Sequence, residues 1–86
     1  MTIDNQYNPD IVFHPASTLK EKLEEMGMST HEFALKTGMP EDTILSILKQ
    51  ESSVTSEMAI LFEDVTGISA KFWINKQTRY DEYINI

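Results

Sequence analysis

The sequence contains no cysteine, and it has only three glycines and three prolines among its 86 residues. Without cysteine, the chain can form neither a disulfide nor a thiolate-ligated zinc site. It also lacks an apolar run near the roughly 18 residues of a membrane span. The N-terminus has neither the basic start nor the apolar stretch of a secretion signal. These absences favour a cytoplasmic protein that does not contact a membrane.

Basic residues are also scarce, since seven stand against 14 acidic residues and give a formal net charge of −7. Such a balance disfavours non-specific nucleic-acid binding and favours either solubility or a basic protein partner. The chain has no nucleophile-elbow, phosphate-loop or zinc-protease motif. His14 and His31 lack a third ligand at metal-binding spacing. We therefore expect no enzyme activity, no metal and no cofactor.

The length suits one domain. Residues 1–13 show no helical period and are predicted to be an irregular N-terminal arm, with "IVF" at 11–13 as the one strand candidate. Residues 14–86 are predicted to form one domain of five short helices. The fold class is therefore all-α.

Cap residues and apolar spacing predict where these helices begin and end. The first covers about residues 15–26, and the third starts at Pro40 as its first helical residue. Ser29 and Glu32 form a capping box at the start of the second helix. The remaining boundary residues are either caps or terminal glycines: Gly27, Gly38, Thr55 or Ser56, Gly67 and Ser69. In the fifth helix the predicted apolar anchors are Phe72, Trp73, Tyr80 and Ile84, with Gln77 as partner of the Trp73 indole N–H.

The second and third helices are joined by "TGMP", which is the layout of a helix-turn-helix. Ala34 is small enough for a close helix crossing, and Gly38 can adopt the positive φ of the turn. Ile44 and Ile47 would anchor the third helix against the second. Many all-helical proteins contain such a pair, so this spacing leaves DNA binding as one of several interpretations.

The flanking segments narrow the choice. "HPASTLKEKLEEMGMSTHEFALKTGMP" and "VTSEMAILFEDVTGISAKFWINKQTRYDEY" resemble the HigA/VapI-type antitoxins of the Xre helix-turn-helix superfamily. The resemblance covers about residues 13–83. Its most specific parts are His14-Pro15, Met58-Ala59 and the ending from Phe72-Trp73 through Gln77 to Tyr80-Asp81. It implies a lambda-repressor-like five-helix fold, a homodimer, a palindromic double-stranded DNA operator and, often, a small basic RNase toxin as partner.

The chain departs from the family pattern around the third helix. Pro40 stands where Ser or Thr usually caps this helix, and Glu41 and Asp42 stand where small or amide side chains are common. After the helix, Lys49-Gln50-Glu51 replaces the usual Asn-Gly followed by a basic residue. These departures bring negative charge to the surface that would meet a polyanion.

We predict that residues 14–86 are a helix-turn-helix DNA-binding domain and that seven of its residues face DNA. The side chains expected to face bases or backbone are Glu41, Asp42, Thr43 and Ser46, and those expected to face phosphates are Thr30, Lys36 and Lys49. Both sets have ordinary structural alternatives, because acids in a first turn complement the helix dipole and polar residues cover solvated helix faces. Lys20 and Lys22 are alternative phosphate contacts, and His31 is expected to be a solvated surface residue.

The alternative function is an acidic protein-interaction module that neutralises a basic toxin, or a stand-alone relic of one with weak or no DNA binding. The C-terminal residues Tyr80, Tyr83, Ile84 and Ile86 are more apolar than a free tail and could pack on the domain or form a dimer surface.

Overall fold

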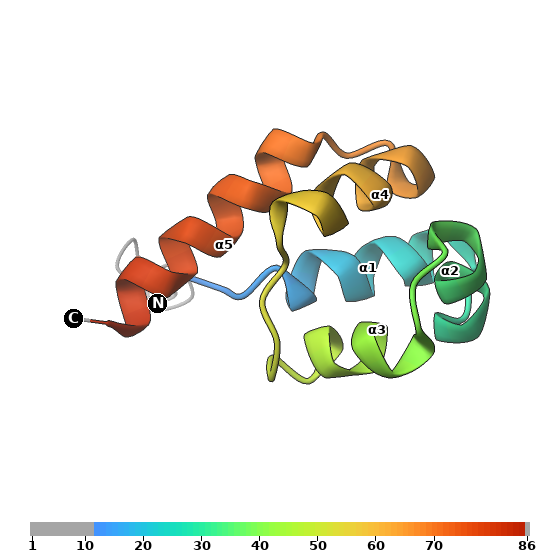
Figure 1. The fold of residues 1–86 in the computed structure, drawn as a ribbon, viewed down its shortest axis with the longest axis horizontal. Helices are drawn as coiled ribbons and strands as arrows, with labels where there is room; N and C mark the ends of the chain where they lie inside the picture. The colour runs from blue at the N-terminus through green and yellow to red at the C-terminus, as the bar shows by residue number, and fades with distance from the viewer. Residues whose placement is uncertain (1–11, 86) are drawn as a thin grey trace, which may run out of the picture.

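A computed structural model describes residues 12–85, and this part of the chain forms five α-helices and no strand (Figure 1). The helices are α1 (Ala16–Met26), α2 (Thr30–Thr37), α3 (Glu41–Leu48), α4 (Ser56–Thr66) and α5 (Ala70–Ile84). The strand candidate is wrong at Val12 and Phe13, which are irregular because no neighbouring strand of the described chain is present to pair with them. Ile11 and the rest of the predicted arm, residues 1–10, lie outside the described residues.

Side-chain caps fix three of the helix starts. Ser29 accepts a hydrogen bond from the Glu32 N–H at 3.0 Å, which is the forward half of the expected capping box. Thr55, rather than Ser56, caps α4 by accepting from the Met58 N–H at 3.2 Å. Ser69 caps α5 in the same way through the Phe72 N–H. Glycines end α1, α2 and α4 in the left-handed conformation, as expected.

Pro40 precedes the third helix, whereas the sequence predicted it to be the first helical residue. It is the N-cap of α3, with φ −61° and an extended ψ of 140°, so Glu41 is the first helical residue. Its ring cannot accept a hydrogen bond, and no side chain of the described residues caps this helix. Glu41 and Asp42 therefore occupy the first turn, where carboxylates interact favourably with the positive end of the helix dipole.

Three buried aromatic rings join the helices at the centre of the core. Phe33 of α2 and Phe62 of α4 meet edge to face at 5.2 Å between ring centroids, and Phe62 meets Trp73 of α5 at the same distance. In Figure 1, α1 crosses the middle of the molecule, α4 and α5 lie above it, α3 lies below it, and α2 closes one end. Ile44 and Ile47 of α3 are fully buried against this core, as predicted.

The prediction for α5 was partly wrong. Trp73 is fully buried, but Phe72 and Ile84 are 40% and 55% exposed and do not anchor the helix. The Trp73 indole N–H donates at 3.2 Å to the carbonyl of Ile68, which precedes α5, rather than to Gln77. Gln77 is buried, but its hydrogen-bond partners lie elsewhere.

None of the helices in the described range is long and apolar enough to cross a membrane.

Candidate nucleic-acid interface

Helix α3 keeps one side in the core and presents the opposite side to solvent. Ile44 and Ile47 are buried, whereas Asp42 and Lys49 are exposed and Ser46 is half-exposed. With 3.6 residues per turn, positions 42, 46 and 49 fall on one line along the helix, opposite the buried pair. The polar side of α3 is therefore uncovered by the described part of the chain, as a helix-turn-helix that binds DNA requires.

The two acids at the start of α3 have different surroundings. Glu41 is half-exposed, and its Oε1 lies 3.3 Å from the Nδ1 of His31, in the first turn of α2. His31 is solvated as expected, with 69% of its side chain exposed, and this contact ties the two helix starts together. Asp42 is exposed on the outward line of α3. Of the two acids, Asp42 is therefore the one without an ion-pair partner among the described residues.

The predicted phosphate contacts differ in accessibility. Lys36 and Lys49 are exposed, and no carboxylate of the described residues lies within ion-pair distance of either. Thr30, at the start of α2, and Thr43, on the flank of α3, are half-exposed. Lys22 pairs with Glu25 at 2.9 Å, which weakens its case as an alternative.

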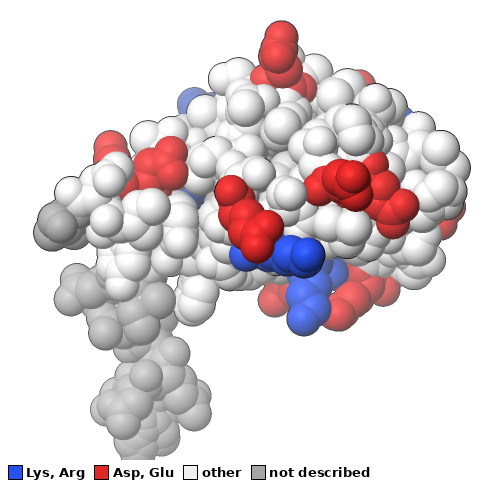
Figure 2. Space-filling view, turned by 60° about the horizontal axis from the view of Figure 1, so that its bottom comes forward, with Lys and Arg blue, Asp and Glu red and all other residues white. Residues whose placement is uncertain are grey.

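Charge on this side of the molecule is mixed. Figure 2 turns the lower side of Figure 1, where α3 lies, toward the viewer. Acidic groups appear at several places on that face, around one small group of basic side chains. The surface therefore offers local basic contacts but not the continuous positive field that supports non-specific DNA binding.

The turn that leaves α3 is built without glycine. The Gln50 N–H donates to the Ile47 carbonyl at 2.9 Å, and the Glu51 N–H donates to the Ser46 carbonyl at 2.8 Å. This pair of hydrogen bonds is a Schellman motif, whose central residue adopts the left-handed conformation. Gln50 has a φ of 64° and is the one non-glycine residue of the described chain with a positive φ. The sequence shows that glycine is missing from this turn. It does not show that Gln50 nevertheless adopts the left-handed conformation of the motif.

His14 forms a buried junction that the sequence reasoning missed. Its Nδ1 accepts a hydrogen bond from the Ala16 N–H at 2.9 Å, and its Nε2 lies 3.1 Å from the Ser52 carbonyl. Because Nδ1 accepts, the neutral tautomer with Nε2–H donating to Ser52 satisfies both contacts. The ring also meets Tyr80 of α5 edge to face at 4.9 Å.

Burial lowers the pKa of His14 from its ordinary value of 6.5, although the Ser52 carbonyl and the Asp81 charge oppose this shift. The neutral ring is therefore the form that the fold favours. The one signal for this residue in the sequence was the His14-Pro15 pair, which is among the most specific parts of the family resemblance.

Gln77 is the second residue with an unpredicted role. Its Oε1 accepts a hydrogen bond from the Val54 N–H at 2.8 Å, and its Nε2 donates to Asp81 Oδ1 at 2.9 Å. Gln77 and Val54 are both about 5% exposed or less. Its spacing of four residues from Trp73 placed it on the buried stripe of α5, but the partner could not be read from the sequence.

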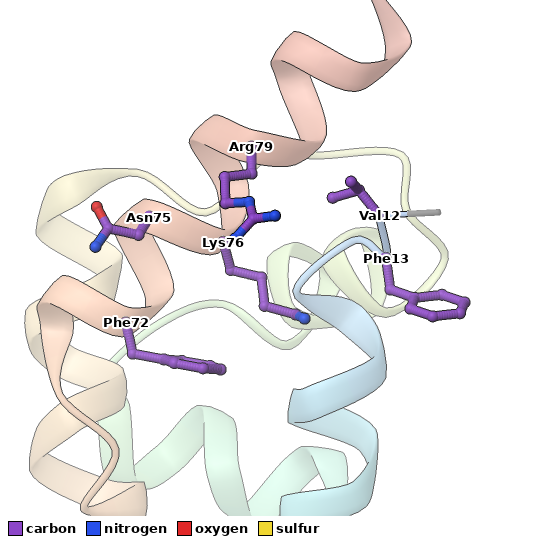
Figure 3. A pocket seen from close by; sticks show the side chains of 6 residues that line it. All are labelled: Val12, Phe13, Phe72, Asn75, Lys76 and Arg79. Atoms are coloured by element: carbon purple, nitrogen blue, oxygen red, sulfur yellow. The ribbon is translucent and has the colours of Figure 1, made fainter. Parts of the chain in front are cut away.

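A separate open pocket of about 290 Å³ lies between the start of the described chain and α5. Phe13 and Phe72 contribute aromatic surface, and Lys76 and Arg79 extend from α5 across the space toward Val12 and Phe13 (Figure 3). The Lys76 amine lies 5.9 Å from the centre of the Phe72 ring. None of the seven predicted DNA-facing residues lines this pocket.

Comparisons with known proteins agree with this geometry. A helix-turn-helix family model matches residues 19–73. Virulence-associated protein I of Dichelobacter nodosus is 30% identical over 82 residues, which cover 94% of this chain and 76% of that protein. The uncharacterized helix-turn-helix-type transcriptional regulator YddM of Escherichia coli K12 is 32% identical over 66 residues, or 77% of this chain and 70% of YddM.

Among solved structures, the antitoxin HigA of Pseudomonas aeruginosa, determined with the higBA promoter, superposes with a TM-score of 0.83. It shares 26% identity, and the match covers 87% of this chain and 83% of HigA.

Proposed function

Because this chain belongs to the Xre-type helix-turn-helix family, with antitoxins and transcriptional regulators as its relatives, we propose that it is a sequence-specific DNA-binding repressor. The observation that carries this proposal is the exposed polar side of α3, opposite the buried Ile44 and Ile47. A helix-turn-helix inserts this side of its second helix into the major groove. The protein would act in the cytoplasm, where its operator is accessible.

The proposed complex is a homodimer on a palindromic operator. Two copies of α3 about 34 Å apart would read half-sites one turn apart. Asp42 and Ser46 lie on the outward line of α3 and would face base edges, with Thr43 and Glu41 on its flanks. A carboxylate at this position suits a cytosine, because the cytosine N4 amine is a donor in the major groove. Lys36, Lys49 and Thr30 would contact phosphates.

The test is binding to a labelled duplex that spans the region directly upstream of the chain's own reading frame. Changing Lys36 and Lys49 to Ala removes four phosphate contacts per dimer. The slope of log K against log salt should then become shallower by roughly 3 to 4, since each contact contributes about 0.9. The matched control is Lys71→Ala with Lys76→Ala, which removes the same charge from α5. A Lys36 and Lys49 variant with wild-type affinity and slope would overturn the phosphate assignment.

A second function is favoured by the net charge of −7 and by the acids on the exposed side of α1. In this case the chain neutralises a small basic RNase toxin, and DNA binding is secondary. Glu21, Glu24 and Glu25 are on α1 and would attract a basic partner. Co-purification from the native host should then yield a complex with a small basic protein. Recovery of the chain alone, with its DNA complex intact, would favour the repressor without a toxin.

A further inference from the structure

The segment between α3 and α4 is held by buried polar side chains from outside the helix-turn-helix. Residues 49–55 leave the C-terminal end of α3 and return to the start of α4, and most of them are exposed. Two of its backbone groups are nevertheless held by buried side chains that belong to other parts of the fold. Val54 donates its N–H to Gln77 of α5, and Ser52 accepts from His14, which comes just before α1.

The Gln77 amide has one orientation that satisfies its surroundings. Val54 presents a donor and Asp81 presents a carboxylate, so the Gln77 oxygen must face Val54 and its nitrogen must face Asp81. A flipped amide would place donor against donor and leave buried groups unpaired, which is costly at this burial. The side chain is therefore a two-ended connector between α5 and the segment that follows α3.

We infer that Gln77 is a positioning residue for DNA binding: its buried amide, oriented by Asp81, fixes the exit of α3 and thereby the placement of Lys49. This inference rests on the proposed function. Lys49 is five residues from Val54 and stands at the C-cap of α3, where the chain leaves the helix. A released exit segment lowers the fraction of molecules whose α3 is correctly placed, and the apparent affinity falls with that fraction.

Exchanging the amide of Gln77 and the carboxylate of Asp81 tests directly whether their hydrogen bonds matter for DNA binding. Gln77→Glu keeps the acceptor for Val54 but sets two carboxylates against each other, so operator affinity should fall by roughly tenfold. Gln77→Glu combined with Asp81→Asn restores a donor facing an acceptor and keeps the net charge of the wild type. This double variant should recover wild-type affinity, and Asp81→Asn alone should remain close to it.

Two controls separate positioning from charge and from loss of folding. Asn75→Asp makes the same amide-to-acid change at an exposed position of α5, and its effect on affinity should be small. Gln77→Met removes both hydrogen bonds without adding charge, and it should also weaken binding at a temperature where circular dichroism shows it fully folded. In that variant the Val54 amide and the amides at the end of α3 should exchange hydrogen faster, while those inside α4 stay protected.

The duplex from upstream of the chain's own reading frame is the probe, and its binding separates the proposed function from the positioning role. If the wild type does not bind it, the proposed function fails, and the positioning role fails with it. If the wild type binds and folded Gln77→Met binds equally well, the proposed function stands and the inference is wrong. Failure of the Gln77→Glu and Asp81→Asn pair to recover affinity, with a wild-type fold, would also overturn it.

Discussion

Replacing Gln50 with Gly should stabilise the protein. Gln50 holds a left-handed backbone conformation with a φ of 64° at the centre of the Schellman motif that ends α3. A residue with a Cβ atom loses about 1–2 kcal/mol in this conformation. Glycine removes that strain, but it raises the conformational entropy of the unfolded chain. This second effect lowers the free energy of unfolding by roughly 0.4–1 kcal/mol. The net gain in the free energy of unfolding should be about 0.5–1 kcal/mol.

Urea denaturation followed by far-UV circular dichroism measures this difference, provided that the m-value is unchanged. For a domain of this size the gain corresponds to a rise in Tm of about 2–8 °C. Gln50→Ala is the matched control, because alanine keeps the Cβ atom and should leave stability near that of the wild type. Gln50→Asn should fall between them, since asparagine tolerates the left-handed region better than most residues.

The reciprocal experiment uses Gly38, which has a φ of 75° and no heavy atom within 4 Å of the position that a Cβ atom would take. Gly38→Ala therefore introduces strain without a clash, and it should cost about 0.5–1 kcal/mol by the same reasoning. If Gln50→Gly is no more stable than Gln50→Ala, or if Gly38→Ala is harmless, backbone strain does not govern these two turns.

Three further predictions concern acid stability, the core and the acidic start of α3. Since burial lowers the pKa of His14, the folded state binds fewer protons than the unfolded state in the pH range between the lowered pKa and 6.5. The free energy of unfolding should therefore fall as the pH drops from 6.5 through that range. His14→Gln should show a weaker pH dependence over the same range in urea titrations, and equal slopes would refute this account. Phe62→Ala should lower the free energy of unfolding, measured by chemical denaturation, by about 3–5 kcal/mol, because the ring lies between Phe33 and Trp73. A decrease below about 1 kcal/mol would mean that the core collapses around the gap. The double change of Glu41 and Asp42 to Gln should raise the affinity for DNA of any sequence in low-salt binding assays. The control, Glu24→Gln with Glu25→Gln on α1, removes the same charge and should raise this affinity less. Equal effects would place the first pair away from DNA.

Most of the fold could be predicted because local chemistry decides it. Ser29, Ser69 and the terminal glycines act through contacts within a few residues, so their positions in the sequence mark the helix ends directly. Pro40 was misplaced by one residue because the same fixed φ suits both the N-cap and the first helical position.

The candidate site was predictable in its exposure but not in its contacts. The spacing of Ile44 and Ile47 determines which side of α3 is buried, and so which residues face outward. The contact between His31 and Glu41 depends on the angle at which α2 and α3 cross. The links from Gln77 to Val54 and from His14 to Ser52 span 23 and 38 residues, and a local pattern carries no information on such distant partners.

Trp73 is the single tryptophan of the chain, and it is fully enclosed where α4 and α5 meet. Its emission therefore comes from one site and needs no attached dye. On excitation of the indole, a shift of the spectrum to longer wavelength would report water reaching the centre of the molecule. Changes confined to the surface of α3 would leave the spectrum as it was. The fluorescence of Trp73 can therefore distinguish a variant that has lost its binding surface from one that has lost its folded core.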